Sequence, residues 1–385
     1  MSVVWGPELD TEGQKWLDIA KDLSEKWFRP LAQEIDRDQR YPTENVQRLV
    51  ESGLAGLFVP ERFGGAGASF VTTCAVIEEV SRACASTGAI LTAYALGGTP
   101  ILIAGTDEQK SRYLGGMANG VAVSFALTEQ GAGSDANAIK TVAERDGDGY
   151  RITGEKIYIG NGGASQHYVV FARTDVEAGA RGISAFFVDK DADGVVIDRY
   201  EDKMGIRGTQ TSNLKLDGAR VTDADMLGSP GRGLRLALNT LNVGRISVAA
   251  QSTGVALAGY ETAAGEAVKR QTFGRPIMDN QGISFPIADV ATELSAARLL
   301  TFQAASVHDA EGDVSVLGAM AKLYASEVAH RAVDIAVQVF GGDGYCKPNI
   351  AERLYRDQRI LEIYEGASQI QRLVIGRAVA ASMSA

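Results

Sequence analysis

The sequence contains few residues that could build a metal site or a disulfide framework. It has only three cysteines and three histidines, and neither set shows the close spacing of metal ligands. No two cysteines form a C-x-x-C pair, and their odd number cannot pair completely. We therefore expect neither a structural metal nor a disulfide-stabilised fold.

The sequence also shows no pattern typical of a targeting or membrane-spanning segment, so we expect neither. Met1 to Lys15 is not a basic segment followed by an apolar one, and no run of about 18 apolar residues is present. Acidic residues outnumber basic ones, with 48 Asp and Glu against 38 Lys and Arg, so the net charge is −10 and the pI is about 5.0. Such a surface repels phosphate backbones and anionic lipids. We expect a cytoplasmic protein that binds neither nucleic acid nor membranes. The net negative charge does not exclude a local basic pocket for a phosphorylated ligand.

The 385 residues, of which 45% are hydrophobic and 22% charged, are typical of a soluble protein with two or three domains. Three zones follow one another. Residues 1–118 are predicted to be helical, because apolar residues from Trp16 to Ile35 recur at steps of three and four. The glycines, 44 against 9 prolines, favour loops between long helices.

Residues 119–227 form the second zone and predict a small antiparallel β-barrel or sandwich. Its segments are short, rich in β-branched and aromatic residues, and separated by glycine turns. The predicted strands cover residues 121–127, 150–153, 156–159, 167–173, 183–188, 195–199 and 212–216.

Residues 228–385 return to helix and, with many small residues, predict a four-helix bundle. The predicted helices cover residues 234–269, 284–309, 314–340, 349–361 and 368–381. The order of helical, β and helical zones makes an α+β multidomain protein. It has no βαβ alternation, which disfavours a Rossmann dinucleotide fold.

Four motifs could carry chemistry, and each also has a purely structural interpretation. Phe125 to Asp135 ends a strand in a loop of glycines and hydroxyls that could bind a cofactor, or could be an ordinary turn. Arg270 to Arg275 could clamp a pyrophosphate, or offset a helix dipole. Gln338 to Tyr345 contains two glycines that suit a helix C-terminus, which leaves Gln338 unexplained.

The fourth motif, Arg356 to Gln371, contains Glu365 between an apolar stretch and Gly366. A carboxylate near a helix start is common, and Ser368 is predicted to cap the last helix. In apolar surroundings, however, the pKa of Glu365 would be raised, and the residue could act as a base near neutral pH.

In their order and spacing these motifs resemble the acyl-CoA dehydrogenase family over nearly the whole chain. Pro60 to Gly67 and Cys84 to Gly88 agree with the same pattern. The resemblance implies a homotetramer that holds FAD across a dimer interface, an acyl-CoA substrate, and an electron-transferring flavoprotein as the acceptor. It also implies the helical, β and four-helix-bundle domains of that family.

The resemblance assigns roles to residues of this sequence. Glu365 is the base that removes the α-proton, while its backbone N–H and a ribityl hydroxyl grip the thioester carbonyl and the β-hydrogen leaves as hydride to flavin N5. The isoalloxazine is lined by Phe125, Leu127, Thr128, Gly133, Ser134, Tyr158, Ile159 and Gly160. The diphosphate and adenosine are reached by Arg270, Thr272, Phe273 and Gln281. The neighbouring subunit supplies Gln338, Val339, Gly341 and Gly342. Ala367 and Gln369 complete the cofactor site. The substrate contacts are Ser134, Tyr94, Asn242, Arg245, Tyr364 and Gly366.

The sequence departs from the family pattern at several positions. Gly244 stands where some branches place the base, which favours Glu365 and a short-chain or branched-chain-like branch. Asn242 replaces a usual Asp, and Tyr158-Ile159-Gly160 replaces Trp-Ile-Thr. With the altered stretch Tyr94 to Thr99, these changes predict an unusual acyl group, branched or cyclic.

Two other functions remain as alternatives. One is a flavin-dependent acyl-CoA oxidase or monooxygenase on the same fold, which the loss of a hydroxyl at Gly160 keeps open. Glu365 argues against the monooxygenase, which needs no such base. The other is a non-catalytic relative that binds nucleic acid, which the net charge disfavours.

Overall fold

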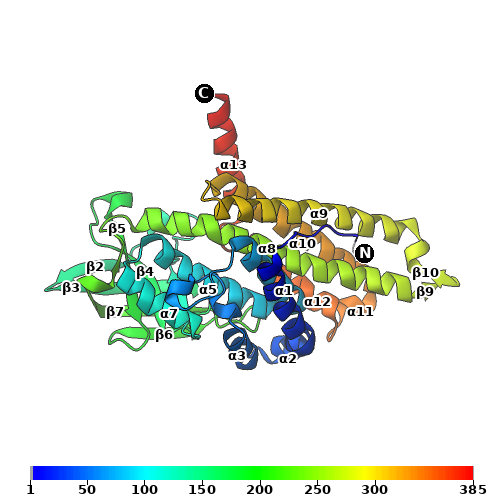
Figure 1. The fold of residues 1–385 in the computed structure, drawn as a ribbon, viewed down its shortest axis with the longest axis horizontal. Coiled ribbons are helices and arrows are strands. Elements are labelled where there is room, and N and C mark those ends of the chain that lie inside the picture. The colour runs from blue at the N-terminus through cyan, green and yellow to red at the C-terminus, as the bar shows by residue number, and fades with distance from the viewer. Residues whose placement is uncertain (1–2, 385) are drawn as a thin grey trace.

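The computed structural model describes residues 3–384 and confirms the predicted three-part architecture. In Figure 1 the β-domain lies at one end of the long axis, and three long helices run along that axis to the other end. These helices are α8 (Gly233–Lys269), α9 (Gln281–Asp309) and α10 (Ser315–Phe340). The predicted ends of α8 and α10 agree with the structure to within one residue.

The N-terminal helices cover one side of this body. The predicted apolar stripe from Trp16 to Ile35 spans α1 (Thr11–Leu23), a π-helical turn (Ser24–Phe28) and α2 (Arg29–Asp38). Asp10 caps α1, because its Oδ1 accepts a hydrogen bond from the Gly13 N–H at 2.7 Å. The remaining helices are α3 (Thr43–Glu51), α4 (Phe70–Ala83), α5 (Ala85–Ala104), α6 (Asp107–Gln109) and α7 (Gly115–Ala118).

Helix α5 is long and apolar enough to cross a membrane by length and composition, but 72% of its most apolar window is buried inside the protein. It packs between α4, α8 and the β-domain. A β-carbon at Gly97 would lie 1.9 Å from the Val123 carbonyl oxygen, so only glycine allows the helix to approach the first strand this closely. Helix α5 is thus a core helix, which explains its lack of a polar face.

The β-domain is a mixed sheet, so the prediction of a wholly antiparallel domain is wrong. Its strands follow the order β6-β7-β3-β2-β4-β5-β8, and β1 pairs with β4. Both β1 and β2 run parallel to β4, while β2 and β3 form an antiparallel hairpin. The strands are β1 (Val123–Ala126), β2 (Val142–Asp146), β3 (Gly149–Ile159), β4 (His167–Arg173), β5 (Ile183–Asp189), β6 (Val195–Tyr200), β7 (Ser212–Thr222) and β8 (Met226–Leu227).

Three strand predictions need correction. The segments 150–153 and 156–159 form a single strand, β3, which is interrupted by a register shift between Ile152 and Gly154. Strands β2 and β8 were not predicted. β2 carries charged residues on an exposed face, and β8 has only two residues, so neither gives a clear hydrophobic pattern.

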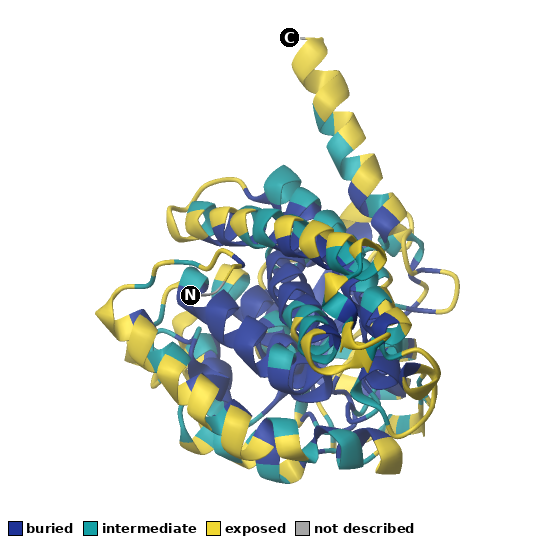
Figure 2. Cartoon of the chain, turned by 90° about the vertical axis from the view of Figure 1, so that its right-hand side faces the viewer, coloured by how far each residue is buried: buried dark blue, intermediate teal, exposed yellow. Residues whose placement is uncertain are grey.

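Close packing in the C-terminal domain depends on small residues, as predicted. Helix α8 contacts α4, α5, α9 and α10. A β-carbon at Gly254 would lie 2.2 Å from the Glu78 carbonyl oxygen of α4, and one at Gly259 would lie 3.0 Å from the Ala332 carbonyl carbon of α10. Two shorter helices follow, α11 (Gly342–Tyr345) and α12 (Ile350–Gln358), and α13 (Ser368–Met383) projects from the body with most residues exposed (Figures 1 and 2).

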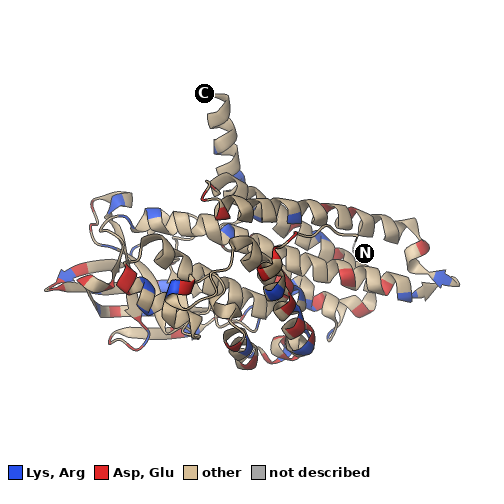
Figure 3. Cartoon of the chain, viewed as in Figure 1, with Lys and Arg blue, Asp and Glu red and all other residues tan. Residues whose placement is uncertain are grey.

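Charged side chains are unevenly distributed. Figure 3 shows acidic and basic residues interspersed along α1 to α3, with fewer along the middle of the long helices. Several pairs on the N-terminal helices are four residues apart, such as Lys26–Asp22 and Arg29–Glu25. Between residues 3 and 384 no three His, Cys, Asp or Glu side chains are placed to hold a metal ion, and all three cysteines are free.

Candidate active site

Glu365 lies in a left-handed turn between the α12 region and α13. A 3₁₀ turn (Arg359–Glu362) follows α12, and then Glu365 and Gly366 adopt φ angles of 53° and 93°. Positive φ is costly for a residue with a side chain, so the surrounding structure must hold Glu365 in place. The prediction that Ser368 caps α13 is wrong. Ala367 occupies the cap position, Ser368 is the first helical residue, and its hydroxyl has no hydrogen-bond partner in the described part of the chain.

Two side chains hold this turn, and neither was predicted from the sequence. Lys322 of α10 donates from Nζ to the Gly366 carbonyl oxygen at 2.8 Å. Gln371 of α13 donates from Nε2 to the same oxygen at 2.7 Å and to the Glu365 carbonyl at 3.3 Å. The available signal was a lysine among small and apolar residues in the middle of a predicted helix, where a charge needs a buried partner.

One oxygen of the Glu365 carboxylate is buried and unpaired within the described residues. Although the residue as a whole is partly exposed, its Oε2 is buried and has no hydrogen-bond partner among residues 3–384. Burial raises the pKa of Glu365 to about 7, and the positive charges of Lys322 and Arg245 oppose this rise. A carboxylate with a pKa near 7 and a free oxygen can accept a proton at neutral pH.

Gly244 of α8 lies directly beside this carboxylate. A β-carbon at Gly244 would lie 3.4 Å from Glu365 Oε2 and 3.0 Å from Leu96 Cδ1 of α5. Positions 244 and 365, the two sequence positions considered for the base, therefore lie next to each other in the structure. Because residue 244 is glycine, that space stays open beside the Glu365 side chain.

Arg245 and Asn242, both predicted substrate contacts, lie on the same stretch of α8. Arg245 is buried and donates from Nη1 to Asn242 Oδ1 at 2.9 Å, while its Nε has no partner in the described chain. Burial lowers the pKa of Arg245, and Glu365 opposes that change. The site thus contains a buried cation without a bonded carboxylate.

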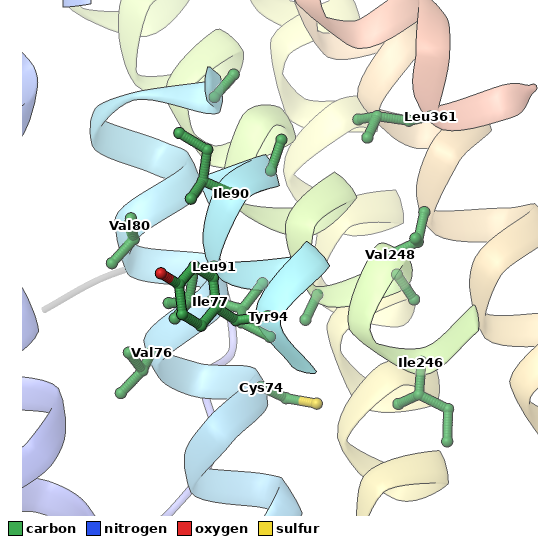
Figure 4. Close-up of a cluster of buried hydrophobic side chains, with 14 of the residues drawn as sticks. Cys74, Val76, Ile77, Val80, Ile90, Leu91, Tyr94, Ile246, Val248 and Leu361 are labelled. Carbon is green, nitrogen blue, oxygen red and sulfur yellow. The ribbon is translucent and has the colours of Figure 1, made fainter. Parts of the chain in front are cut away.

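Tyr364 and Tyr94, also predicted substrate contacts, use their hydroxyls within the protein. The Tyr364 hydroxyl hydrogen-bonds to Gln251 Oε1 on α8, and burial raises its pKa. Tyr94 is buried among apolar residues of α4 and α5 (Figure 4), and its hydroxyl donates to the Gly120 carbonyl at 3.1 Å. The position of Tyr94 does not support its predicted role, and Leu96 approaches Gly244 instead.

The loop from Leu127 to Thr141 is anchored by a buried ion pair that the sequence analysis missed. Lys156 is completely buried, and its Nζ lies 2.7 Å from Glu129 Oε1 and donates to the carbonyls of Leu127 and Phe171 at 3.1 and 2.6 Å. Glu129 also accepts from the backbone N–H groups of Lys140 and Thr141. This network fixes the loop that carries Thr128, Gly133 and Ser134.

The surface of this loop fits a flat cofactor. No atom lies within 4 Å of a β-carbon built at Gly131, Gly133 or Gly160. Ser134 is exposed, and Tyr158 is 60% exposed with its backbone N–H bonded to Asn213. Open backbone at these glycines and an exposed hydroxyl at Ser134 are features that suit a planar ring with polar edges.

Comparison with known proteins agrees with this geometry. Sequence models of three acyl-CoA dehydrogenase domains match the chain, the N-terminal domain at residues 10–121, the middle domain at 124–219 and the C-terminal domain at 231–380. The chain belongs to the acyl-CoA dehydrogenase family. The recognition and fold predicted from the sequence are thereby confirmed, as is an oxidoreductase function. Membership also supports a flavin cofactor.

Three relatives of the acyl-CoA dehydrogenase family are about equally similar to the chain. An acyl-CoA dehydrogenase of Bacillus subtilis is 42% identical over 361 residues, which cover 93% of this chain and 95% of the relative. A 3-(aryl)acrylate reductase of Clostridium sporogenes is 42% identical with 93% and 95% coverage. The short-chain specific acyl-CoA dehydrogenase of Bos taurus mitochondria is 42% identical with 96% and 90% coverage.

Two solved structures are similar along almost their whole length. Butyryl-CoA dehydrogenase from Megasphaera elsdenii is 36% identical with a TM-score of 0.95, covering 98% of this chain and 100% of that one. A chain from a study of the electron transferring flavoprotein of Acidaminococcus fermentans is 38% identical with a TM-score of 0.95, covering 97% and 99%.

In this acyl-CoA dehydrogenase the segments assigned to the diphosphate and adenosine lie far from the β-domain. Arg270 follows α8, and the hairpin of β9 (Gln271–Thr272) and β10 (Arg275–Pro276) extends the tip of the molecule (Figure 1). Phe273 at its turn has φ 53° and is fully exposed, and Thr272 and Gln281 lie nearby in the chain with partial to full exposure.

Arg270 Nη1 donates to the Phe340 carbonyl at 2.9 Å, beside Gly341 at the end of α10. Gln338, Gly341 and Gly342 are exposed there, whereas Val339 is buried. The expectation that Arg270 and the Gln338–Gly342 segment come from different subunits is therefore wrong, because one chain places them side by side. Near the base, Ala367 is half-buried and Gln369 is exposed.

Proposed function

We propose that this acyl-CoA dehydrogenase uses FAD to convert a short acyl-CoA thioester, branched or cyclic in its acyl group, to the 2-enoyl-CoA. The observation that carries the proposal is the Glu365 oxygen Oε2, which is buried and unpaired beside Gly244. A base in this state can take the α-proton without first breaking an ion pair.

The protein residues divide the work of the reaction. Glu365 accepts the α-proton on its free carboxylate oxygen, and the backbone N–H of Glu365 is the proposed donor to the thioester carbonyl, which becomes more negative as the proton leaves. Arg245 and Lys322 supply positive charge around this region. The flavin, when bound, provides the acceptor for the hydride that leaves the β-carbon.

FAD would be held by the loop from Phe125 to Ser134 and by the edge from Tyr158 to Gly160. The rigid support of this loop by Lys156 and Glu129 favours a fixed ring position. The separation between the β-domain and Arg270 means that the Arg270 and Gln338–Gly342 segments would serve the cofactor of a second copy. We propose a homotetramer built from such dimers.

The acceptor of the electrons would be an electron-transferring flavoprotein. The similarity to a chain studied with such a flavoprotein supports this proposal. The similarity to an arylacrylate reductase is also compatible with the reverse direction, reduction of a 2-enoyl thioester.

The acyl group would lie beside the Glu365 carboxylate, in the region bordered by Gly244 and Leu96. Because residue 244 is glycine, no side chain crowds the Glu365 carboxylate from α8, where a β-carbon would already lie 3.0 Å from Leu96 Cδ1. The altered stretch Tyr94 to Thr99, which contains Leu96, also supports an unusual acyl group. We therefore expect isobutyryl-, 2-methylbutyryl- or cyclohexanecarboxyl-CoA to give a higher kcat/KM than butyryl-CoA. A maximum at straight butyryl-CoA would contradict the branched or cyclic assignment, while leaving dehydrogenation intact.

The decisive experiment is anaerobic bleaching of the flavin by a panel of acyl-CoA thioesters, performed on the wild type and on Glu365→Gln. The wild type should bleach with at least one thioester, and the variant should bleach at least roughly a hundredfold more slowly, as for loss of a general base. Retained bleaching in the variant would overturn the base assignment. Rapid reoxidation of the reduced enzyme by O₂ alone would instead favour an oxidase.

A further inference from the structure

Lys322 is a buried lysine in the middle of α10 that reaches the turn carrying Glu365. Its side chain is fully buried, and its Nζ donates to the Gly366 carbonyl oxygen at 2.8 Å. Between residues 3 and 384 no carboxylate lies within ion-pair distance of this ammonium group. Its bonded partner is therefore a neutral carbonyl at the active site.

A positive charge on the buried Lys322 side chain is energetically unfavourable. Burial penalises the ammonium form and lowers the pKa of Lys322 to about 8, although Glu365 and Glu362 oppose that change. A methionine has nearly the same length and would avoid the cost. The buried charge of Lys322 therefore suggests a function, and Glu365 is the catalytic group proposed closest to it.

We propose that Lys322 is a positioning residue for the base: its ammonium group fixes the Glu365–Gly366 turn through the Gly366 carbonyl, and its charge favours the ionised carboxylate without pairing with it. This inference rests on the proposed function of Glu365 as the base.

The geometry separates holding the turn from neutralising the base. The hydrogen bond from Lys322 goes to the backbone of Gly366, and Glu365 Oε2 has no partner among the described residues. A direct ion pair would stabilise the anion but would also occupy the oxygen that must accept the proton. Because Lys322 bonds to Gly366, one residue after Glu365, its charge still stabilises the ionised Glu365 carboxylate. The Glu365 oxygen Oε2 stays available to accept the proton.

The other groups that face this region are few within the described chain. Arg245 of α8 is the second cation that acts on Glu365, and the buried Tyr364 hydroxyl is bonded to Gln251. Glu362 faces Lys322 but is itself bonded to His330 and Gln358 and lies within ion-pair distance of Arg359. Glu327 also acts on Lys322 and is paired with Arg372. Loss of Lys322 would therefore leave Arg245 as the cation acting on Glu365.

Three variants separate the two roles of Lys322. Lys322→Gln can keep a donor to the Gly366 carbonyl but removes the charge. Lys322→Met removes both donor and charge. Gln371→Leu is the matched control, because it removes the other donor to the same oxygen and leaves the charge in place.

The first measurement is the pH profile of kcat/KM. Lys322→Gln should move its acidic limb to higher pH and approach the wild-type rate above the new limb. Lys322→Met should show the same shift with a rate at least roughly tenfold lower at every pH, since the turn also loses a donor. Gln371→Leu should lower the rate without moving the limb. An unmoved limb in both Lys322 variants would overturn the inference.

The second measurement needs no acyl-CoA. Thermal unfolding is followed against pH for the wild type, Lys322→Gln, and each combined with Glu365→Gln. Glu365→Gln should raise Tm, because it removes the cost of ionising a buried carboxylate. This increase in Tm should become larger as the pH rises and Glu365 of the parent protein ionises. When Lys322→Gln is also present, the increase in Tm caused by Glu365→Gln should continue to a higher pH than in the wild type. An identical pH dependence with and without Lys322→Gln would overturn the inference.

The two proposals fail in different ways. A wild type that no acyl-CoA bleaches would defeat the proposed function, while the unfolding series still tests the coupling of Lys322 to Glu365. A wild type that bleaches, with both pH series unchanged by loss of Lys322, defeats only the role of Lys322. If Lys322→Met does not fold, Lys322→Gln still carries both comparisons.

Discussion

Glu365 Oε2 lies 3.4 Å from the point that a β-carbon would occupy at Gly244. The same point is 3.0 Å from Leu96 Cδ1, closer than ordinary van der Waals contact. A methyl group at position 244 would therefore crowd Leu96 and come into van der Waals contact with the base.

We predict that Gly244→Ala lowers kcat/KM by about tenfold or more for branched substrates, because a small displacement of a base is costly in rate. Steady-state kinetics with butyryl-CoA and isobutyryl-CoA would measure it. Gly265→Ala, on the same helix with no atom within 4 Å of the new methyl, is the control and should leave the kinetics unchanged. Equal kinetics of the wild type and Gly244→Ala would show that the acyl group does not use this space.

The pH dependence of the reaction should report the ionisation of Glu365. Burial raises its pKa from 4.5 to about 7, and only the ionised form accepts a proton. We expect kcat/KM to fall about tenfold per pH unit below that value. A limb below pH 5 would mean that the cations outweigh burial.

The stability of the protein should show the opposite trend over the same range. Because the folded pKa of Glu365 is raised, the folded state keeps its proton to a higher pH than the unfolded state does. The contribution of Glu365 to stability is therefore complete below about pH 4.5 and is lost as pH rises through about 7. Glu365→Gln should remove this loss, and Tm measured from pH 5 to 8 would reveal it.

The ion pair between Lys156 and Glu129 should control cofactor retention. Lys156→Met leaves a buried carboxylate and two carbonyls without their cation, which costs about 3–5 kcal/mol of stability. We expect a lower Tm and loss of flavin during gel filtration, measured by absorbance. Lys140→Met is the control, because Lys140 bonds to Glu129 through its backbone N–H, which the substitution keeps. Full flavin content in Lys156→Met would contradict this role.

Helix packing gives a prediction that is independent of the flavin. Gly254→Ala places a methyl group 2.2 Å from the Glu78 carbonyl and should lower Tm, whereas Gly265→Ala, with open space, should raise stability by up to about 1 kcal/mol through its helix propensity. Differential scanning calorimetry of the two variants makes the comparison. A stable Gly254→Ala would show that α4 and α8 can separate at little cost.

The sequence predicted the elements that have long, regular patterns. The ends of α8 and α10 and the strand 167–173 agree with the structure because the two helices are long, Ala-rich stretches and the strand is a short run rich in β-branched and aromatic residues. The parallel pairing of β1 with β4 could not be predicted, since it depends on where distant segments meet. The domain boundaries at 118 and 227 stay predictions.

In the active site, sequence patterns singled out Glu365, Gly244 and Arg245, and the structure brings them together. Lys322 and Gln371 were not predicted because their importance arises from contacts between segments that are far apart in the sequence. The substrate contact assigned to Tyr94 stays a prediction, and its side chain is buried with its hydroxyl bonded to the Gly120 carbonyl.

Helix α8 carries Gly244 near its first third and Arg270 just beyond its end, about 39 Å further along the axis. One chain therefore cannot bring both to a single dinucleotide, and each flavin would need one chain for its ring and another for its adenosine. Two inactive variants with damage at opposite ends, such as Glu365→Gln and Arg270→Ala, should then rescue each other when co-expressed. In a mixed dimer of the two variants, one active site would contain both substitutions. The other active site would contain neither and would be native.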